Sequence, residues 1–279
     1  MADEYPEQIV VDPEEVRKRR QIAEAVAEAY RRIPQICGIH LWGSTVLGDA
    51  DRDSDVDVGI YLSGTIPTEE ERMSAMRGLI DDPASVTFGE IKGLEAYDKQ
   101  RVRGLWVGVG WWLFESNLQG IRNTLAGLLD TLDDAKAENE LGEIQRLILL
   151  WDPQGLQADL QSMVGDWFQT DGKRQIIEKR LARAEHETTQ HLPRALAKGD
   201  VVWAEDSRRN ALNELIRVVY YLNNRFLRRL KGVDIELRDF EIKPPEFVGR
   251  IRAVATCGLR SSVPALAELL QDVGRLAGM

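Results

Sequence analysis

The chain has few cysteines and no long apolar run. Only Cys37 and Cys257 occur in 279 residues, which is too few for a disulfide framework, and neither has metal-ligand spacing. No apolar run approaches the roughly 20 residues that a membrane span requires. The first four residues include Asp3 and Glu4, and they lack the basic start and the apolar stretch of a secretory signal, so no such signal is expected. These absences predict a cytoplasmic protein with reduced, buried thiols and no membrane partner.

The chain also lacks an excess of basic residues. It has 36 Lys and Arg against 46 Asp and Glu, a formal net charge of -10. Proteins that bind long nucleic acids need basic surface for phosphate contacts, so this balance argues against DNA or RNA as the main partner. An acidic surface suits cationic small molecules, but it also serves solubility alone. The composition, 43% hydrophobic and 29% charged, is that of a soluble globular protein with one large or two ordinary domains.

The hydrophobic periodicity changes along the chain. The front half mixes helical and strand patterns, whereas the pattern beyond a break near residues 151–156 is helical throughout. A capping Asp12 followed by Pro13 marks the first helix start. The predicted strands are 37–42, 55–62, 86–91 and 105–114, and the predicted helices are 12–30, 68–79, 125–132, 138–150, 173–198, 201–229, 245–256 and 263–276.

The most informative segment is Gly43-Ser44, ten further residues, and then Asp55-Val56-Asp57. The second part alternates acidic and apolar residues, which is typical of a strand. Residues i and i+2 of a strand face the same way about 6.6 Å apart. Two carboxylates held this close repel each other unless a cation lies between them. The pattern therefore predicts a divalent metal site that handles phosphates.

This motif resembles the signature of the DNA polymerase β-like nucleotidyltransferase superfamily. The strand 106–113, with Gly108 and Gly110, is similar to a Trp- and Gly-rich strand of small bacterial members, the aminoglycoside and lincosamide nucleotidyltransferases. Residues 219–226 are similar to part of their helical domain. The resemblance implies an α+β fold, with a mixed-sheet nucleotidyltransferase domain over 1–153 and an all-helical, substrate-binding bundle over 154–279.

The resemblance also implies a chemistry. A short helix after Gly43 would point backbone N–H groups at a triphosphate, with the Ser44 hydroxyl as a further donor. Asp55 and Asp57 would be catalytic and would hold two Mg²⁺ ions. The implied reaction moves a nucleoside monophosphate from an NTP, with ATP expected, to a hydroxyl of a small-molecule acceptor and releases pyrophosphate. The acceptor is expected in a cleft between the halves of a monomer or homodimer.

One part of the superfamily pattern is missing from the sequence. Members usually carry a third carboxylate on a later strand, and the closest register would place an Asp near Ile121, where there is none. Glu90, on the strand before, and Glu115, at the end of the Trp-rich strand, are the candidate substitutes. Glu90 is slightly favoured because it follows the first helix after the motif directly. Without a third acid, nucleotide binding without turnover is the alternative.

Other interpretations of the front half are weaker. Acidic residues at alternate positions from Asp49 suggest a calcium loop, but the glycine and glutamate of an EF-hand are absent at the required positions, so a solvated loop is preferred for Asp49, Asp51 and Asp53. A hydrolase pairing of Ser44 with His40 lacks the Gly-x-Ser-x-Gly elbow, and His40 is predicted to be a packed strand residue. Trp106, Trp111 and Trp112 are predicted to be core, with stacking of one of them on a base as the alternative.

The helical half offers two weaker signals. Arg180 and His186 match the loose Arg–His pattern of HEPN ribonucleases, but a solvated charged face is the preferred explanation, because this helix carries many Arg and Glu residues. Glu214 could face a cleft and attract the amine of an aminoglycoside-like acceptor. Antibiotic modification is thus one option, and a toxin–antitoxin nucleotidyltransferase acting on protein or tRNA is another.

Overall fold

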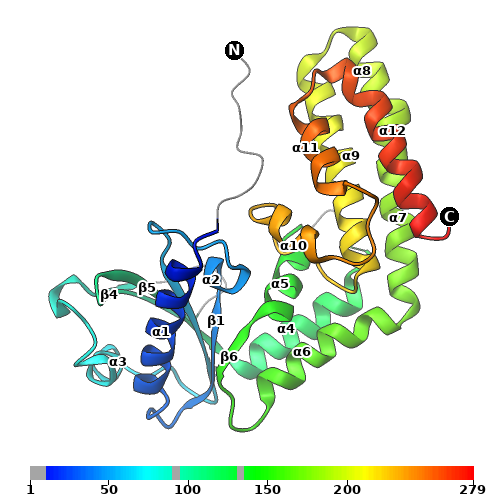
Figure 1. Ribbon diagram of the computed structural model, residues 1–279. Coiled ribbons are helices and arrows are strands. Elements are labelled where there is room, and N and C mark those ends of the chain that lie inside the picture. The colour runs from blue at the N-terminus through cyan, green and yellow to red at the C-terminus, as the bar shows by residue number, and fades with distance from the viewer. Residues whose placement is uncertain (1–10, 90–94, 131–134) are drawn as a thin grey trace. The chain divides into compact units, whose positions relative to one another are not determined.

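The computed structural model describes residues 11–89, 95–130 and 135–279. Its chain divides into two compact units (Figure 1). The first comprises residues 1–128 and 140–164, and the second comprises 129–139 and 165–279. A mixed sheet lies in the first unit and the second is helical, which confirms the predicted α+β fold class. The functional boundary predicted at residue 153 stays a prediction.

A six-stranded sheet of order β3-β4-β5-β2-β1-β6 is the frame of the first unit. Neighbouring strands are antiparallel except for β2 and β5, which run parallel. The strands are β1 Ile36–Trp42, β2 Val56–Leu62, β3 Thr87–Gly89, β4 Ala96–Val102, β5 Leu105–Leu113 and β6 Ile148–Trp151.

The helices are divided between the two units. Those with residues in the first unit are α1 Pro13–Tyr30, α2 Ser44–Leu47, α3 Glu69–Met76, α4 Phe114–Gly127, α5 Ala135–Arg146 and α6 Leu156–Asp166. Those of the second unit are α7 Asp171–His186, α8 Leu192–Lys198, α9 Val201–Leu222, α10 Val233–Asp239, α11 Phe247–Thr256 and α12 Leu259–Leu276. A π-helical turn, Glu187–His191, joins α7 to α8.

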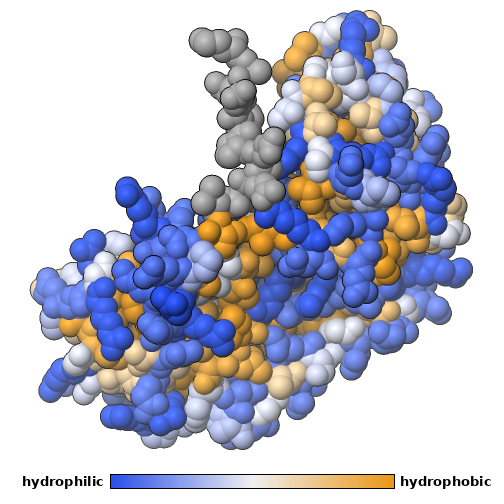
Figure 2. Space-filling view, in the orientation of Figure 1, coloured by the Kyte–Doolittle hydropathy of each residue, from blue (hydrophilic) through white to orange (hydrophobic). Residues whose placement is uncertain are grey.

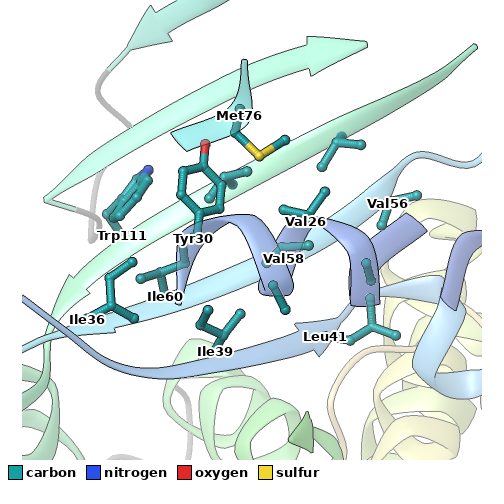
Figure 3. Close-up of a cluster of buried hydrophobic side chains, with 14 of the residues drawn as sticks. Val26, Tyr30, Ile36, Ile39, Leu41, Val56, Val58, Ile60, Met76 and Trp111 are labelled. Atoms are coloured by element: carbon teal, nitrogen blue, oxygen red, sulfur yellow. The ribbon is translucent and has the colours of Figure 1, made fainter. Parts of the chain in front are cut away.

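Helix α1 covers one face of the sheet. Its start is capped by Asp12, whose Oδ1 accepts from the backbone N–H groups of the first turn. Val26 and Tyr30 on its buried stripe pack against Val58 and Ile60 of β2, and all four are at most 1% exposed (Figure 3). The alternate residues of β2 point away from this core, so Asp57 lies on the opposite face of the sheet.

Two strands were not expected from the sequence. β4 was missed because Asp98 and Gln100 occupy two of its buried positions, which hides the alternation of apolar and polar residues. The segment of β6 was predicted as the end of a helix, which is wrong. Four consecutive apolar residues fit either structure, and here they pair with β1 at the edge of the sheet.

Two helices of the second unit differ from the prediction. The predicted helix 173–198 is interrupted by the π turn. The predicted helix 201–229 ends at Leu222, because Asn224 adopts the left-handed conformation with φ 55°. Figure 2 shows hydrophilic side chains over much of the visible face of each unit. Within the described ranges, none of the helices has the length and apolar character needed to cross a membrane.

Candidate active site

The two aspartates lie in a row of residues that crosses the sheet. Asp57 of β2 pairs with Trp42 of β1 on one side and with Gly108 of β5 on the other. Gly108 in turn pairs with Lys99 of β4. Paired residues of adjacent strands project from the same face, which is here the face opposite α1. Gly108, which has no side chain, therefore separates Asp57 from Lys99 in this row.

The turn after β1 lies against Asp57. Gly43 has φ 78° and ψ -153°, a conformation that is costly for any residue with a side chain. A Cβ atom at this position would overlap Oδ2 of Asp57. The glycine is therefore needed twice, for the backbone conformation and for the close approach to the carboxylate. Ser44 follows as the first residue of α2 and is 6% exposed.

Asp55 precedes β2 and has a cationic neighbour. Lys99 Nζ lies 3.7 Å from Asp55 Oδ2, and both side chains are about two-fifths exposed, at 39% and 42%. The same ammonium group lies 5.4 Å from the centre of the Trp106 ring. The ion pair is therefore solvated and contributes little to stability, but it places a positive charge beside the predicted metal ligand.

Tyr97 completes this cluster. A Cβ atom on Gly108 would meet the Tyr97 hydroxyl at 2.5 Å, so the phenol lies over the glycine. Burial raises the pKa of Tyr97, and the negative charges of Asp57 and Asp55 raise it further. The hydroxyl thus stays protonated beside the carboxylates and is able to donate a hydrogen bond.

The loop before Asp55 is anchored from α1. The guanidinium of Arg19 is fully buried and donates from Nε and Nη2 to the carbonyl oxygen of Ser54, at 2.9 and 2.8 Å. Arg19 also pairs with Glu15. Within the loop, Asp51 Oδ1 accepts from the Ser54 hydroxyl at 2.8 Å and from the Asp53 amide at 3.0 Å. The acidic loop is therefore ordered by its own hydrogen bonds, and Asp55 starts from a fixed backbone.

The predicted third carboxylates have different outcomes. Glu90 lies outside the described residues. Glu115 is exposed in the first turn of α4, beyond the end of β5. It is separated from Gly108 by five strand residues, about 17 Å at roughly 3.3 Å each, and by part of a helical turn. The structure does not bring Glu115 to Asp55 and Asp57.

No other acid replaces it on the neighbouring strands, which are described in full. The side chains of β4 and β5 on the Asp57 face are neutral or basic. They are Tyr97, Lys99, Arg101, Trp106, Trp112 and the glycines 108 and 110. Asp98 points to the core instead, where Arg72 Nε lies 3.1 Å from its Oδ2 and Trp111 Nε1 donates to it at 2.9 Å.

The remaining front-half predictions concern packing. His40 is 3% exposed, and its Nδ1 lies 2.7 Å from Gln157 Oε1, so it is the packed strand residue that was expected. Trp111 is fully buried. Trp112 packs in an aromatic cluster with His40 and Tyr61. Trp106, which is on the Asp57 face, is 38% exposed.

In the second unit, Arg180 is bound within the protein. It is 2% exposed, donates to both carboxylate oxygens of Glu214 at 2.9 and 3.0 Å, and donates to Glu138 at 3.0 Å. Arg217 also pairs with Glu138. These contacts explain Arg180 as a structural residue rather than a ribonuclease residue, and they give Glu214 a cationic partner inside the unit.

The chain matches the nucleotidyltransferase domain family over residues 19–103. Residues 19–103 form a nucleotidyltransferase domain. The match covers the Gly-Ser turn, both aspartates and strand β4, so the predicted enzyme class and the resemblance to the DNA polymerase β-like superfamily are confirmed. The nucleotidyltransferase domain supports nucleoside monophosphate transfer as the general reaction.

Solved structures similar to the chain were also found. One is a nucleotidyltransferase-like protein from Exiguobacterium sibiricum, with 13% identity, 92% of this chain and 74% of that chain covered, and a TM-score of 0.40. Another is CdnC from E. coli in complex with HORMA-deltaN, with 13% identity, 94% and 93% covered, and a TM-score of 0.33. No curated protein matches the chain. The assignment therefore depends on the family match.

Sequence reasoning missed Tyr97 and Lys99 because it missed the strand that carries them. The signal was present: Ala96, Asp98, Gln100 and Val102 alternate with the residues of the Asp57 face. Because two of these four core positions are polar, the alternation is visible only once their partners are in place, which are Arg72 and Trp111 for Asp98 and Tyr30 for Gln100.

Proposed function

We propose that the nucleotidyltransferase domain binds an NTP, with ATP as the donor, and transfers its nucleoside monophosphate to a hydroxyl of a small-molecule acceptor. Pyrophosphate is the second product. The observation that carries the proposal is the contact between the Gly43 turn and the Asp57 carboxylate. A phosphate-binding turn and a metal-binding carboxylate that share one space suit a ligand in which phosphate oxygens and a cation occur together.

The donor set fits Mg²⁺. Asp55 and Asp57 supply hard carboxylate oxygens, and the described residues contain no group of three or more His, Cys, Asp or Glu that could hold a metal by itself. Mg²⁺ is usually held by one or two carboxylates together with substrate phosphates. When bound, a pair of such ions would stabilise the entering and leaving oxygens of the displacement.

The chain's own residues have separate proposed roles. Gly43 lets the triphosphate approach the backbone, and Ser44 offers a hydroxyl donor. Lys99, beside Asp55, would neutralise part of the negative charge of the bound phosphates. Tyr97 would donate a hydrogen bond from a hydroxyl that its neighbours keep protonated.

The acceptor is proposed to be a small molecule that the helical unit helps to bind. The net charge of -10 supports this choice over long nucleic acids. It also favours a cationic acceptor, although Glu214 is already paired with Arg180.

Calorimetry and a turnover assay test the proposal together. The wild type should bind ATP in the presence of Mg²⁺. Asp55→Asn and Asp57→Asn should each weaken this binding. Asp53→Asn is the matched control, because Asp53 is 87% exposed in the preceding loop. Pyrophosphate release is then measured across small-molecule acceptors, tRNA and protein. Unchanged Mg²⁺-dependent binding in both aspartate variants would overturn the metal assignment.

A second candidate is a nucleotide-binding protein without turnover. It is favoured by the residues beside Asp57 on β5 and β4, which are Gly108 and Lys99 rather than an acid. Mg²⁺-dependent ATP binding without pyrophosphate release on any acceptor would support it. Release with one acceptor would exclude it.

A further inference from the structure

Two of the three histidines of the chain meet in the helical unit. His186 ends α7 and His191 ends the π-helical turn that follows, at the end of the unit where α8 begins (Figure 1). Residues five apart lie on one face in a π helix, whereas an α helix would separate them. The turn therefore brings the two imidazoles together, and π-helical turns frequently occur at functional sites.

The two rings approach each other through their Nε2 atoms. His186 Nε2 and His191 Nε2 are 3.1 Å apart, and the ring planes differ by 69°. Two imidazole nitrogens that each lie about 2.0–2.1 Å from one tetrahedral metal ion are about 3.3–3.4 Å apart. The observed separation is thus within a few tenths of an ångström of that needed for one ion between them.

Glu187 fixes the tautomer of one ring. Its Oε2 lies 3.2 Å from His191 Nδ1, and the Glu187 side chain is 19% exposed. A carboxylate accepts, so Nδ1–H donates to it and Nε2 of His191 carries a lone pair. Metal-binding histidines typically donate their other ring N–H to a carboxylate in this way. Trp203 packs on the other side, with its ring centre 5.6 Å from that of His191.

We propose that His186 and His191 bind one late first-row divalent cation, Zn²⁺ foremost, through their Nε2 atoms. Imidazole nitrogen suits Zn²⁺, Ni²⁺ and Cu²⁺, whereas Mg²⁺ takes oxygen ligands. The site is therefore chemically distinct from the aspartates of the nucleotidyltransferase domain. Without the ion, Nε2 of His186 carries the proton of the hydrogen bond between the rings, because Nε2 of His191 accepts. When the ion binds, His186 would carry its proton on Nδ1 instead, so no net proton release is needed. The ion would cross-link the π turn, and water would complete its coordination.

Zinc titration of the untagged full chain in excess Mg²⁺ tests the site. The wild type should bind one Zn²⁺, and His186→Ala and His191→Ala should each weaken it at least about tenfold, the loss typical of removing even an outer partner. Glu187→Gln should weaken it by about tenfold. The control Gln190→Ala, an exposed residue of the same turn, should bind as the wild type does.

A second readout locates the ion. Cu²⁺ bound between the histidines should quench the fluorescence of Trp203, and Trp203→Phe and His191→Ala should each remove that part of the quenching. The double variant Asp55→Asn with Asp57→Asn should retain both signals. Equal Zn²⁺ affinity in the wild type and in His186→Ala, with both folded by circular dichroism, would overturn the proposal. Loss of binding in the double aspartate variant would also overturn it.

Discussion

Lys99 Nζ lies 3.7 Å from Asp55 Oδ2 on the face of the sheet that carries both aspartates. Lys99 thus lies beside the two aspartates on a face where strands β4 and β5 carry no third carboxylate. Its ammonium group is positioned both to balance the carboxylate and to meet the phosphates of a bound nucleotide.

Replacing this lysine should weaken nucleotide binding. Lys99→Met should lower the affinity for ATP with Mg²⁺ by roughly 10- to 150-fold, since a charge-assisted hydrogen bond contributes about 1.5–3 kcal/mol. Lys99→Arg should restore most of the loss. Arg101→Met is the control, because Arg101 lies two residues further along β4, with its guanidinium 4.9 Å from the Trp106 ring centre. Equal affinities of wild type and Lys99→Met by calorimetry would refute the role.

The two glycines of the turn allow a matched comparison. Gly43 and Gly48 both have φ 78°, but only a side chain at Gly43 would meet Asp57, whereas nothing lies within 4 Å of one at Gly48. Gly48→Ala should lose about 1–2 kcal/mol of unfolding free energy from the left-handed backbone, and Gly43→Ala about 1–3 kcal/mol from a backbone region almost confined to glycine. Only Gly43→Ala should also lose Mg²⁺-dependent ATP binding. Similar binding by the two variants would contradict the shared site.

Burial of His40 predicts a pH-dependent stability. Burial lowers the pKa of His40 to about 4, below the value of about 6.5 expected in the unfolded chain. The unfolded state therefore takes up the proton first, and up to about 3 kcal/mol of stability, present above pH 6.5, is lost as the pH falls toward 4.

Denaturant unfolding at several pH values tests this expectation. His40→Asn keeps a neutral donor toward Gln157 and should show a flatter dependence between pH 6.5 and 4 than the wild type. The variant should be less stable at pH 7.5, because the imidazole fills the space over Gly59. An unchanged slope would mean that His40 does not cause the pH dependence.

Arg19 should matter for both stability and the site. Arg19→Met leaves the Ser54 carbonyl without its buried donors, which should cost about 1–3 kcal/mol and weaken ATP binding through a less fixed Asp55. Arg17→Met is the control, since Arg17 is 70% exposed and its ion pair with Glu14 is long, at 3.9 Å. That change should stay within about 0.5 kcal/mol. Equal stability of the two variants would refute the anchoring role.

Features that depend on local pattern follow from the amino-acid sequence. Gly43-Ser44 and Asp55-x-Asp57 identify the turn and the strand because they combine a backbone requirement with a period of two. The helical second half follows from its periodicity. The match to the nucleotidyltransferase domain family extends this local pattern to residues 19–103.

The surroundings of those residues depend on how the strands assemble into the sheet. Lys99 and Tyr97 reach the aspartates through β4, whose polar core residues Asp98 and Gln100 make sense only against Arg72, Trp111 and Tyr30. The separation of Glu115 from the site depends on the register of β5 against β2. Strand pairing joins residues that are far apart in sequence, and no local period encodes which strands become neighbours.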